Sequence, residues 1–411
     1  MIKYNLLLYL ISPYLLLSII FGSFQRKSGF KFISQRLGLS SIKNFSNTIW
    51  LHAASIGETK LALLIYNKLK ESNPEQKFLI TTNTESSSRL IKSLNNKNIE
   101  HLYLPIDWFF AMKRFFASIN PKICIIVETE IWPNLLNRCK KNNVPSIIIN
   151  ARLSKKSTDK SNFIKNVYKE ALLDITKILC KSDLEKDKYI KLGAAEDKID
   201  VVGNLKFSEY RELKNKESLI DRRYVLAAST HHDEEMQIIQ EWLKLKEKKL
   251  LLVVVPRHPE RLGDILSQLP LSDIEISIRS KNEEVKNETQ IYIADTYDEL
   301  DKWIKHSEFV FMGGSLIDHG GQNFLEAAFY SKTIIVGPFM YNFISETEEF
   351  LKKNALLMVK ESSMLKGVFQ KLIKSKNKRE LFGNNAKKIM ESKKDIADHY
   401  CKAIQELIAD S

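Results

Sequence analysis

Two stretches of the chain alternate between apolar segments of strand length and amphipathic segments of helix length. The first stretch runs from residues 47–55, NTIWLHAAS, to residues 198–203, KIDVVG. The second runs from residues 224–229, YVLAAS, to residues 355–359, ALLMV. Continuous apolar strands separated by amphipathic helices are typical of a parallel sheet covered by helices on both faces. The pattern therefore predicts an α/β protein with two Rossmann-like domains.

The predicted domain limits follow changes in composition along the chain. We expect an N-terminal anchor at residues 1–24, a first domain at 25–208, a polar linker at 209–223, and a second domain at 224–411 that ends in charged helices. Two such domains with a cleft between them form the architecture called GT-B among glycosyltransferases. Ligands of these sheets bind beyond the carboxyl ends of the strands, so the loops there are the first places to look for chemistry.

The N-terminal segment at residues 5–22 is apolar apart from a few small or aromatic polar side chains, and Arg26, Lys27 and Lys31 follow it. It has no obvious small-residue cleavage site, which favours an uncleaved membrane anchor over a signal peptide. Its 18 residues reach ~27 Å as a helix, so it could span a ~30 Å hydrocarbon core or lie within the near leaflet. The basic residues predict a cytoplasmic body. A buried core helix is the alternative.

The net charge of the chain limits the kinds of molecule that it is expected to bind. The 411 residues include 63 Lys and Arg against 50 Asp and Glu, a net charge of +13. Such an excess indicates nucleic acid, an anionic membrane or an anionic substrate, although a compositional bias toward lysine could also produce it. We find no nucleic-acid-binding motif. The four cysteines and eight histidines lack metal-ligand spacing, so we predict no metal site.

Acidic residues follow two predicted strands of the first stretch. Glu58, in HAASIGE, opens a helix directly after a strand, where it could cap the helix or act as a general base. Glu128 and Glu130, in VETEIWPN, stand at the end of another strand, next to Trp132. Two carboxylates and a tryptophan at one strand end are unusual for packing alone.

Basic residues follow two further strands of the same stretch. Arg152, with Lys155 and Lys156 nearby in NARLSKKS, could meet an anion or simply form a basic turn. Lys206, in VVGNLKF, stands at the end of the first block and by position faces the predicted cleft.

The second stretch has the features of a nucleotide-binding half. Arg257 follows a strand within Pro-Arg-His-Pro, a rigid context that predicts a fixed guanidinium. Glycine pairs at 313–314 and 320–321 lead from a strand into a helix, where backbone N–H groups favour phosphate. Glu326, in that helix, could accept hydrogen bonds from ribose hydroxyls or complement the helix dipole.

Ten strings in this order together closely resemble the bacterial 3-deoxy-D-manno-octulosonic acid (Kdo) transferase family: HAASIGE, YLPIDW, VETEIWPNLL, NARLSKKS, GNLKF, AASTHHDEE, VPRHPER, ADTYDEL, GGSLIDHGGQNFLEAA and GPFMYNF. The resemblance covers about residues 1–350. It implies an inverting, metal-independent GT-B glycosyltransferase of lipopolysaccharide biosynthesis, without a cofactor, at the cytoplasmic face of the inner membrane. Its partners would be the donor CMP-Kdo, the lipid A precursor and membrane phospholipid, and not nucleic acid.

The resemblance also implies roles for individual residues. Glu58 matches the proton acceptor of the family, and Glu128 and Lys206 match its transition-state stabilisers. Positions that match the family's contacts to the CMP moiety are Pro256, Arg257, Tyr297, Asp298, Glu299, Asn323, Phe324, Leu325 and Glu326. By the chemistry of the reaction, a helix N-terminus with Lys206 and Arg257 could stabilise the leaving phosphate, while Glu128 could hold a cation or face the oxocarbenium-like centre.

Several motifs depart from the family pattern. DTYDEL replaces DTMGEL, GGQNFLE replaces GGHNPLE, GPF replaces GPH, and STHHDEE replaces STHEGEE. Because these loops belong to the expected donor site, donor orientation or efficiency could differ. The alternatives are a membrane-associated GT-B transferase that uses another nucleotide sugar, and a non-catalytic, basic, membrane-tethered binding protein.

Overall fold

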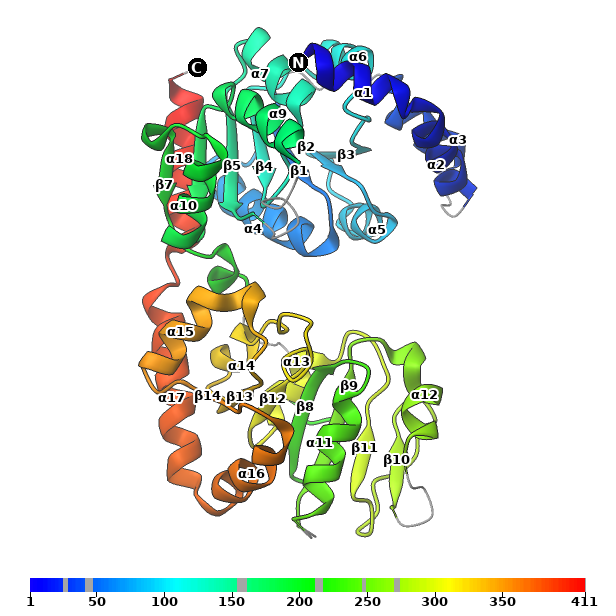
Figure 1. Cartoon of the computed structure of the whole chain (residues 1–411), viewed down its shortest axis with the longest axis vertical. Helices are drawn as coiled ribbons and strands as arrows, with labels where there is room; N and C mark the ends of the chain where they lie inside the picture. Colours follow the sequence, from blue (N-terminus) through cyan, green and yellow to red (C-terminus); the bar gives the residue numbers. More distant parts are fainter. Residues whose placement is uncertain are drawn as a thin grey trace. The chain divides into compact units, whose positions relative to one another are not determined.

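A computed structural model gives the fold of the chain and describes residues 1–24, 29–40, 47–153, 161–210, 217–245, 249–269 and 274–410. The chain forms two compact units: residues Met1–Glu209 with Asp395–Ser411, and residues Tyr210–Lys394. Each unit contains a seven-stranded parallel sheet with helices on its faces (Figure 1). The prediction of two parallel α/β domains is confirmed.

The first unit is built on a sheet with the strand order β3-β2-β1-β4-β5-β6-β7. Its strands are β1 Ile49–Ala53, β2 Phe78–Thr82, β3 Ile99–Tyr103, β4 Ile123–Val127, β5 Ser146–Ala151, β6 Lys177–Cys180 and β7 Ile199–Val201. Its helices are α1 Ile2–Leu10, α2 Ser12–Phe24, α3 Gly29–Arg36, α4 Ile56–Ser72, α5 Glu85–Ser93, α6 Phe109–Ile119, α7 Pro133–Lys141, α9 Asn162–Leu173, α10 Asp183–Leu192 and α18 Ile396–Ala409.

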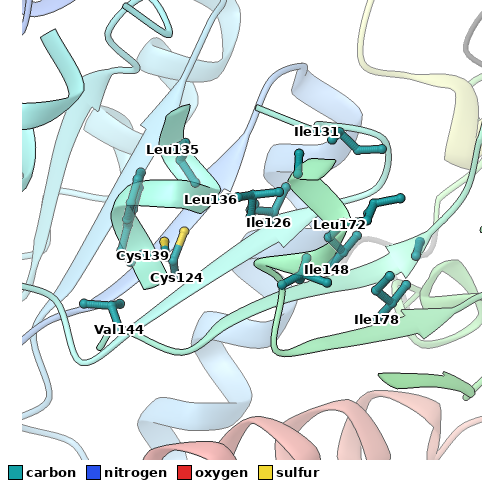
Figure 2. Close-up of a cluster of buried hydrophobic side chains, with 14 of the residues drawn as sticks. Cys124, Ile126, Ile131, Leu135, Leu136, Cys139, Val144, Ile148, Leu172 and Ile178 are labelled. Carbon is teal, nitrogen blue, oxygen red and sulfur yellow. The ribbon is translucent and has the colours of Figure 1, made fainter. Parts of the chain in front are cut away.

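Aliphatic side chains fill the core between this sheet and its helices. Every residue of β1, β2 and β4 is buried, which explains why these strands are almost uniformly apolar. Figure 2 shows one side of the core, where Ile126 and Ile148 of the sheet pack with Leu136 of α7. Cys124 and Cys139 lie in the same cluster as small apolar residues.

The second unit repeats the architecture with the strand order β10-β11-β9-β8-β12-β13-β14. Its strands are β8 Tyr224–Thr230, β9 Leu251–Pro256, β10 Ile276–Ile278, β11 Ile291–Ile293, β12 Val310–Met312, β13 Ile334–Val336 and β14 Leu356–Met358. Its helices are α11 Glu234–Leu243, α12 Leu262–Ser267, α13 Leu300–His306, α14 Leu325–Phe329, α15 Ile344–Lys352, α16 Leu365–Lys374 and α17 Lys376–Ser392.

The last helix belongs to the first unit, which corrects the expectation that residues 224–411 form one domain. Helix α18 packs against α4, and Tyr400 Oη donates a hydrogen bond to the carbonyl of Gly203 at 2.8 Å. Asp398 forms an ion pair with Lys68 of α4 at 2.7 Å. The apolar face of α18 contains Ile396, Tyr400 and Ile404, and all three are buried. Residues 211–216 of the predicted linker lie outside the described residues.

The predicted N-terminal anchor forms two helices rather than one. Helices α1 and α2 meet at Ile11 with a bend of 59°. Pro13 in the first turn of α2 explains the break, because it has no N–H to donate to the carbonyl of Tyr9. Among the described residues, no single helix has the length and apolar composition of a membrane span, whereas this bent pair meets that test jointly.

Candidate functional site

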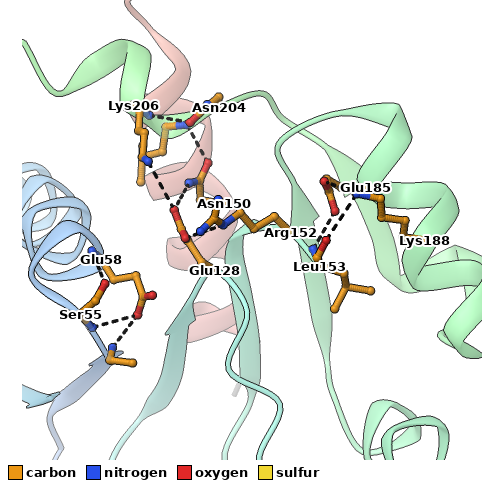
Figure 3. Close-up of polar contacts among 12 residues, drawn as sticks. Ser55, Glu58, Glu128, Asn150, Arg152, Leu153, Glu185, Lys188, Asn204 and Lys206 are labelled. Atoms are coloured by element: carbon orange, nitrogen blue, oxygen red, sulfur yellow. Dashed lines mark hydrogen bonds and ion pairs between the residues drawn. The ribbon is translucent and has the colours of Figure 1, made fainter. Parts of the chain in front are cut away.

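Glu58 stands at the third position of α4, directly after the buried strand β1 (Figure 3). Ser55 caps the helix, and its Oγ accepts a hydrogen bond from the Glu58 N–H at 3.4 Å. Glu58 Oε2 in turn accepts from the N–H groups of Ala54 at 2.6 Å and Ser55 at 3.3 Å. This is a capping box. The other oxygen, Oε1, accepts no hydrogen bond from the residues that the structure describes, so one carboxylate caps the helix and keeps an oxygen available.

The surroundings of Glu58 favour its protonated form. Burial and the nearby carboxylates of Glu128 and Glu130 together raise the pKa of Glu58 to about 7, against the opposing effect of the capping hydrogen bonds. A carboxylate with a pKa near neutrality is better matched to removing a proton from a hydroxyl than one with an ordinary pKa. The electrostatics of this loop therefore suit a general base as well as a cap.

Glu128 follows β4 with a left-handed backbone, φ 64°, and its side chain is almost completely buried. The carboxylate is held from three directions (Figure 3). Arg152 Nε lies 2.7 Å from Oε2, the Asn150 side-chain amide donates to Oε1 at 3.3 Å, and Lys206 Nζ lies 4.0 Å from Oε1. The prediction from sequence named Glu128, Arg152 and Lys206 separately, and the structure brings their charged groups together.

Asn150 joins this cluster to the loop that carries Lys206, a role the sequence analysis missed. Its side-chain oxygen accepts from the N–H of Leu205 at 2.9 Å, while its amide nitrogen binds Glu128. Asn150 is buried and has a φ of 49°, a conformation that asparagine adopts more readily than most residues. The sequence feature that could have indicated this role is the presence of a polar residue in the otherwise apolar string SIIINA. Lys155 and Lys156 lie outside the described residues.

Glu130 is tied to a second residue that the sequence analysis did not single out, His52 of β1. The His52 ring is fully buried, its Nδ1 lies 3.0 Å from Thr81 Oγ1, and its Nε2 lies 3.6 Å from Glu130 Oε2. Trp132 Nε1 donates to the same carboxylate oxygen at 2.8 Å. Burial acts to raise the pKa of Glu130, but His52 and Trp132 outweigh it and hold that pKa below its usual value. Glu130 therefore remains a carboxylate near Glu58.

The glycine-rich loop after β12 in the second unit is already bound to a carboxylate. Glu234, at the start of α11, accepts hydrogen bonds from the N–H groups of Gly314 at 2.6 Å, Ser315 at 3.0 Å and Leu316 at 2.9 Å. It also accepts from His231 N at 3.2 Å. The amides of Gly314 and Ser315 are therefore engaged by Glu234, whereas the phosphate site expected at the helix N-terminus that follows the glycine pairs stays a prediction.

The side chain of Arg257 is not held in a fixed position, as the sequence had predicted that it would be. Its backbone N–H donates to the carbonyl of Thr230 at 2.9 Å, which fixes the main chain after β9. The side chain is exposed and forms no hydrogen bond or ion pair with the described part of the chain. The guanidinium is thus accessible to an anion rather than fixed. By contrast, Arg261 one turn later is held by both oxygens of Glu235, at 3.1 and 3.3 Å. Pro256, which precedes Arg257, is the buried last residue of β9.

The loop after β11 carries three of the predicted donor contacts. Tyr297 is exposed and donates from its hydroxyl to Glu260 at 2.7 Å. Asp298 is exposed and has a φ of 61°, which explains why a glycine suits the DTMGEL pattern and why aspartate is tolerated there. Arg279 binds both oxygens of Glu299, at 2.8 and 3.1 Å, and holds the Glu299 pKa below its usual value. Glu299 therefore positions the loop.

The start of α14 contains the remaining four predicted contacts. The Asn323 amide donates to the hydroxyl of Tyr210, and its oxygen accepts from the N–H of Leu325 at 3.2 Å. Phe324 and Leu325 are fully buried, and Phe324 packs against Phe350 in the core. A ligand can reach these two residues only through their backbone. Glu326 is half-buried in the first turn.

A histidine cluster that the sequence analysis missed lies beside the glycine-rich loop. The rings of His231 and His319 stack with their centroids 3.9 Å apart. The Gln322 side-chain amide donates to His231 Nε2 at 2.8 Å. Burial, together with the nearby His319, lowers the pKa of His231 to about 4, so this ring is neutral at pH 7. Gln322 thus binds the imidazole as a neutral donor where the related pattern has a histidine.

Comparisons with known proteins agree with the motif resemblance. A family model described as 3-Deoxy-D-manno-octulosonic-acid transferase (kdotransferase) matches residues 31–209. The chain is 32% identical over 351 residues to the 3-deoxy-D-manno-octulosonic acid transferase of Haemophilus influenzae, which covers 82% of this chain and 81% of that protein. It is 30% identical over 368 residues to the enzyme of the same name from Rickettsia bellii, with 87% of each chain covered.

A solved structure with a similar fold is the UDP-GlcNAc 2-epimerase of Neisseria meningitidis bound to UDP-GlcNAc. It superposes with a TM-score of 0.59 over 89% of this chain and 100% of that chain, at 12% sequence identity. At this identity the likeness concerns the two-domain fold alone.

Proposed function

Because the chain belongs to the 3-deoxy-D-manno-octulosonic acid transferase family and is therefore a glycosyltransferase of lipopolysaccharide biosynthesis, we propose that it transfers Kdo from CMP-Kdo to the lipid A precursor with Glu58 as the proton acceptor. The observation that carries this proposal is the Glu58 carboxylate, which has one capping oxygen, one oxygen available to a substrate and a pKa of about 7.

In the proposed reaction, a hydroxyl of the acceptor sugar donates its hydrogen bond to Glu58 Oε1. As the hydroxyl oxygen forms its bond to C2 of Kdo, its proton passes to the carboxylate. The bond between C2 and the phosphate oxygen of CMP breaks, and its electron pair remains on the phosphate. Attack from the face opposite to CMP inverts the anomeric centre. This sequence needs a base for the acceptor and a cation for the phosphate, and no metal or cofactor enters it.

We assign to Glu128 the role of holding cations rather than facing the sugar. Its carboxylate is buried and already pairs with Arg152, with Lys206 close to its other oxygen. A buried carboxylate in such a pair fixes the position of the guanidinium and ammonium groups. Lys206 and Arg152 would then present positive charge to the carboxylate or phosphate of CMP-Kdo, and Glu128 would stabilise the transition state through them.

On the donor side we propose that the exposed Arg257 guanidinium meets the CMP phosphate, and that Asn323 and Glu326 bind the nucleoside. Phe324 and Leu325 would contribute backbone groups, since their side chains belong to the core. Glu299 would act by holding its loop through Arg279. The exposed Asp298 carboxylate would have to point away from the phosphate to avoid repulsion.

We further propose that the enzyme works at the cytoplasmic face of the inner membrane. The support is the exposed apolar surface of the N-terminal helices and the absence of any acidic residue before Glu58 in the sequence. Both features suit a protein beside anionic phospholipid that acts on a lipid acceptor.

The test is a transfer reaction with the purified full-length chain, CMP-Kdo and a tetra-acylated lipid A precursor, followed by mass spectrometry of the lipid. We expect a mass increase of one or more Kdo residues and competition by CMP but not by UDP. No product with CMP-Kdo, together with product from another nucleotide sugar, would overturn the donor assignment. Product on a different lipid would overturn the acceptor assignment alone.

A further inference from the structure

Helices α1 and α2 are largely apolar, and protein covers their inner sides along most of their length. Tyr4 and Leu8 of α1 pack with Val167 of α9. Ile19 of α2 is buried in a second cluster with Tyr103 of β3. A helix that crosses a bilayer leaves the body of its protein and meets lipid on all sides. In this protein the two helices pack against the rest of the first unit from the first turn of α1 to the second half of α2.

Buried polar contacts also hold α1 on the body. The hydroxyl of Tyr4 donates to Asp107 Oδ2 at 2.9 Å. Asp107 accepts two further hydrogen bonds at 2.9 Å from the backbone N–H groups of Asn134 and Leu135 at the start of α7. The Asn134 side-chain amide donates to Asn5 Oδ1 at 2.7 Å. Moving α1 away from the body would expose this buried carboxylate and break its bond to Tyr4, so the docked position is strongly favoured.

The outer side of the same helices exposes large apolar side chains. Ile2 is 87% exposed, Leu10 71%, Leu17 66%, Phe21 66% and Phe24 83%. Phe30 of α3, at 82%, extends this surface, which we call the apolar outer face. Helices α1, α2, α3 and α6 lie together in the first unit (Figure 1). A helix pair with one side on protein and the other on lipid must be apolar all round, which explains a pattern that looks like a span in the sequence.

Most of the charged groups around the apolar outer face are cations, and the exposed Glu170 of α9 pairs with the N-terminal ammonium of Met1 at 2.7 Å. Residues 1–57 contain no Asp or Glu. Lys3 and Lys31 are exposed beside the face, as are Lys113 and Arg114 of α6, a helix whose sequence FFAMKRFFASI also has no acidic residue. Exposed apolar side chains with an excess of cations on the same helices match the surface of an anionic bilayer, where the side chains enter the acyl region and the cations meet the headgroups.

We propose that α1 and α2 lie in the plane of the membrane, with the apolar outer face inserted into the near leaflet of an anionic phospholipid bilayer and the inner side docked on the body. The pair then holds the first unit against one leaflet without crossing to the other. This inference rests on the proposed membrane location and not on the roles assigned to Glu58 or Arg257.

Topology is tested with two single-cysteine variants of the full-length chain, Lys3→Cys and Lys31→Cys, expressed in a Gram-negative host. The four native cysteines are buried, which keeps background labelling low. We expect a membrane-impermeant maleimide to label both variants on inverted inner-membrane vesicles and neither on spheroplasts. Labelling of Lys3→Cys on spheroplasts, with Lys31→Cys labelled only on inverted vesicles, would mean a crossing pair and would overturn the proposal.

Lipid contact is tested by flotation with vesicles of equal parts phosphatidylglycerol and phosphatidylcholine. Phe21→Asp should weaken binding about tenfold or more, while Leu381→Asp, at a 56% exposed position on α17, should leave it unchanged. Both variants should retain Kdo transfer to a detergent-dispersed acceptor, which separates a failure of docking from a failure of catalysis. Unaltered binding of Phe21→Asp would overturn the proposal. So would a dimer in vesicle-free solution that Phe21→Asp dissociates, since a second copy would then cover the face.

Discussion

The two units place a glutamate at the same point of their sheets and use it differently. Glu58 follows β1 and Glu234 follows β8, the first strand of each unit, and each carboxylate accepts from the N–H three residues earlier, at 3.3 Å from Ser55 and 3.2 Å from His231. Burial raises the pKa of both. In Glu234 both oxygens are occupied by loop amides, whereas Glu58 keeps Oε1 available.

The loop beside each glutamate explains the difference. Next to Glu234, the loop after β12 supplies N–H groups, and Gly314 adopts a φ of 66° that turns the chain toward the carboxylate. Next to Glu58, the loop after β4 supplies the carboxylates of Glu128 and Glu130 instead. A helix-capping glutamate that is surrounded by backbone amides holds a loop in place. One that is surrounded by other carboxylates is a candidate general base.

The largest effect on structure is expected from Glu234→Ala. It leaves three loop N–H groups and that of His231 without their acceptor, and an unsatisfied buried donor costs ~1–3 kcal/mol. Because the loop can relax, we expect a loss of about 3 kcal/mol in the local stability of residues 313–322. Hydrogen exchange followed by mass spectrometry measures this loss directly. Protection equal to that of the wild type would show that the clamp contributes nothing.

The pH dependence of transfer should follow the pKa of Glu58. Because the base is the carboxylate, kcat/KM should fall about tenfold per unit as the pH drops below about 7. Stability should respond in the opposite sense. The folded-state pKa lies above the unfolded value, so the charged form weakens folding above pH 7 and this penalty disappears as the pH falls toward 4.5. A rate that stays constant from about pH 5 to pH 8 would contradict the assignment.

Ser55→Ala separates the two roles of the capping box. It removes the acceptor for the Glu58 N–H and should cost ~1 kcal/mol of stability, as loss of an N-cap does. The bonds from Ala54 and Ser55 N–H to Glu58 Oε2 remain, so the base stays in place and kcat should change little. Urea unfolding measures the change in the free energy of unfolding, and steady-state kinetics on the same preparation measure kcat. A collapse of kcat with intact folding would mean that the serine hydroxyl itself takes part.

The smallest expected effect is a change in the pH profile of Glu128→Gln. Removing this negative charge should lower the pKa of Glu58, so the acidic limb of kcat/KM should move toward lower pH. The maximal rate should also decrease, because Arg152 loses its buried partner. Leu381→Asp, which changes charge on the other unit, is the matched control and should leave the profile in place.

Much of the fold could be predicted because local pattern and tertiary structure agree. The apolar strings around Leu51 and Ile125 are strands in the structure, and the amphipathic string from residue 58 forms α4. Helix α18 was assigned to the wrong unit because an amphipathic helix does not specify which apolar surface covers it. Residues 5–22 are almost uniformly apolar, so their sequence did not indicate that one side packs on protein and the other side is exposed.

The position of a candidate residue was predictable where it follows its own strand, as for Glu58, Glu128 and Lys206, whose roles stay predictions. The site was not predictable where partners come from distant loops. Glu234 reaches an amide 82 residues away at Leu316, and no local pattern indicates that the glycine loop is already bound. Phe324 matches a family contact position yet belongs to the core, because matching a motif does not state which way a side chain points.

Glu58→Gln tests the central claim most directly. Glutamine keeps an oxygen for the capping box but cannot take a proton at neutral pH, so the variant should fold with a Tm at pH 8 equal to or above that of the wild type. Its kcat for Kdo transfer to the lipid A precursor should fall by about 10²–10⁴. Near-normal transfer by a folded Glu58→Gln protein would contradict the account.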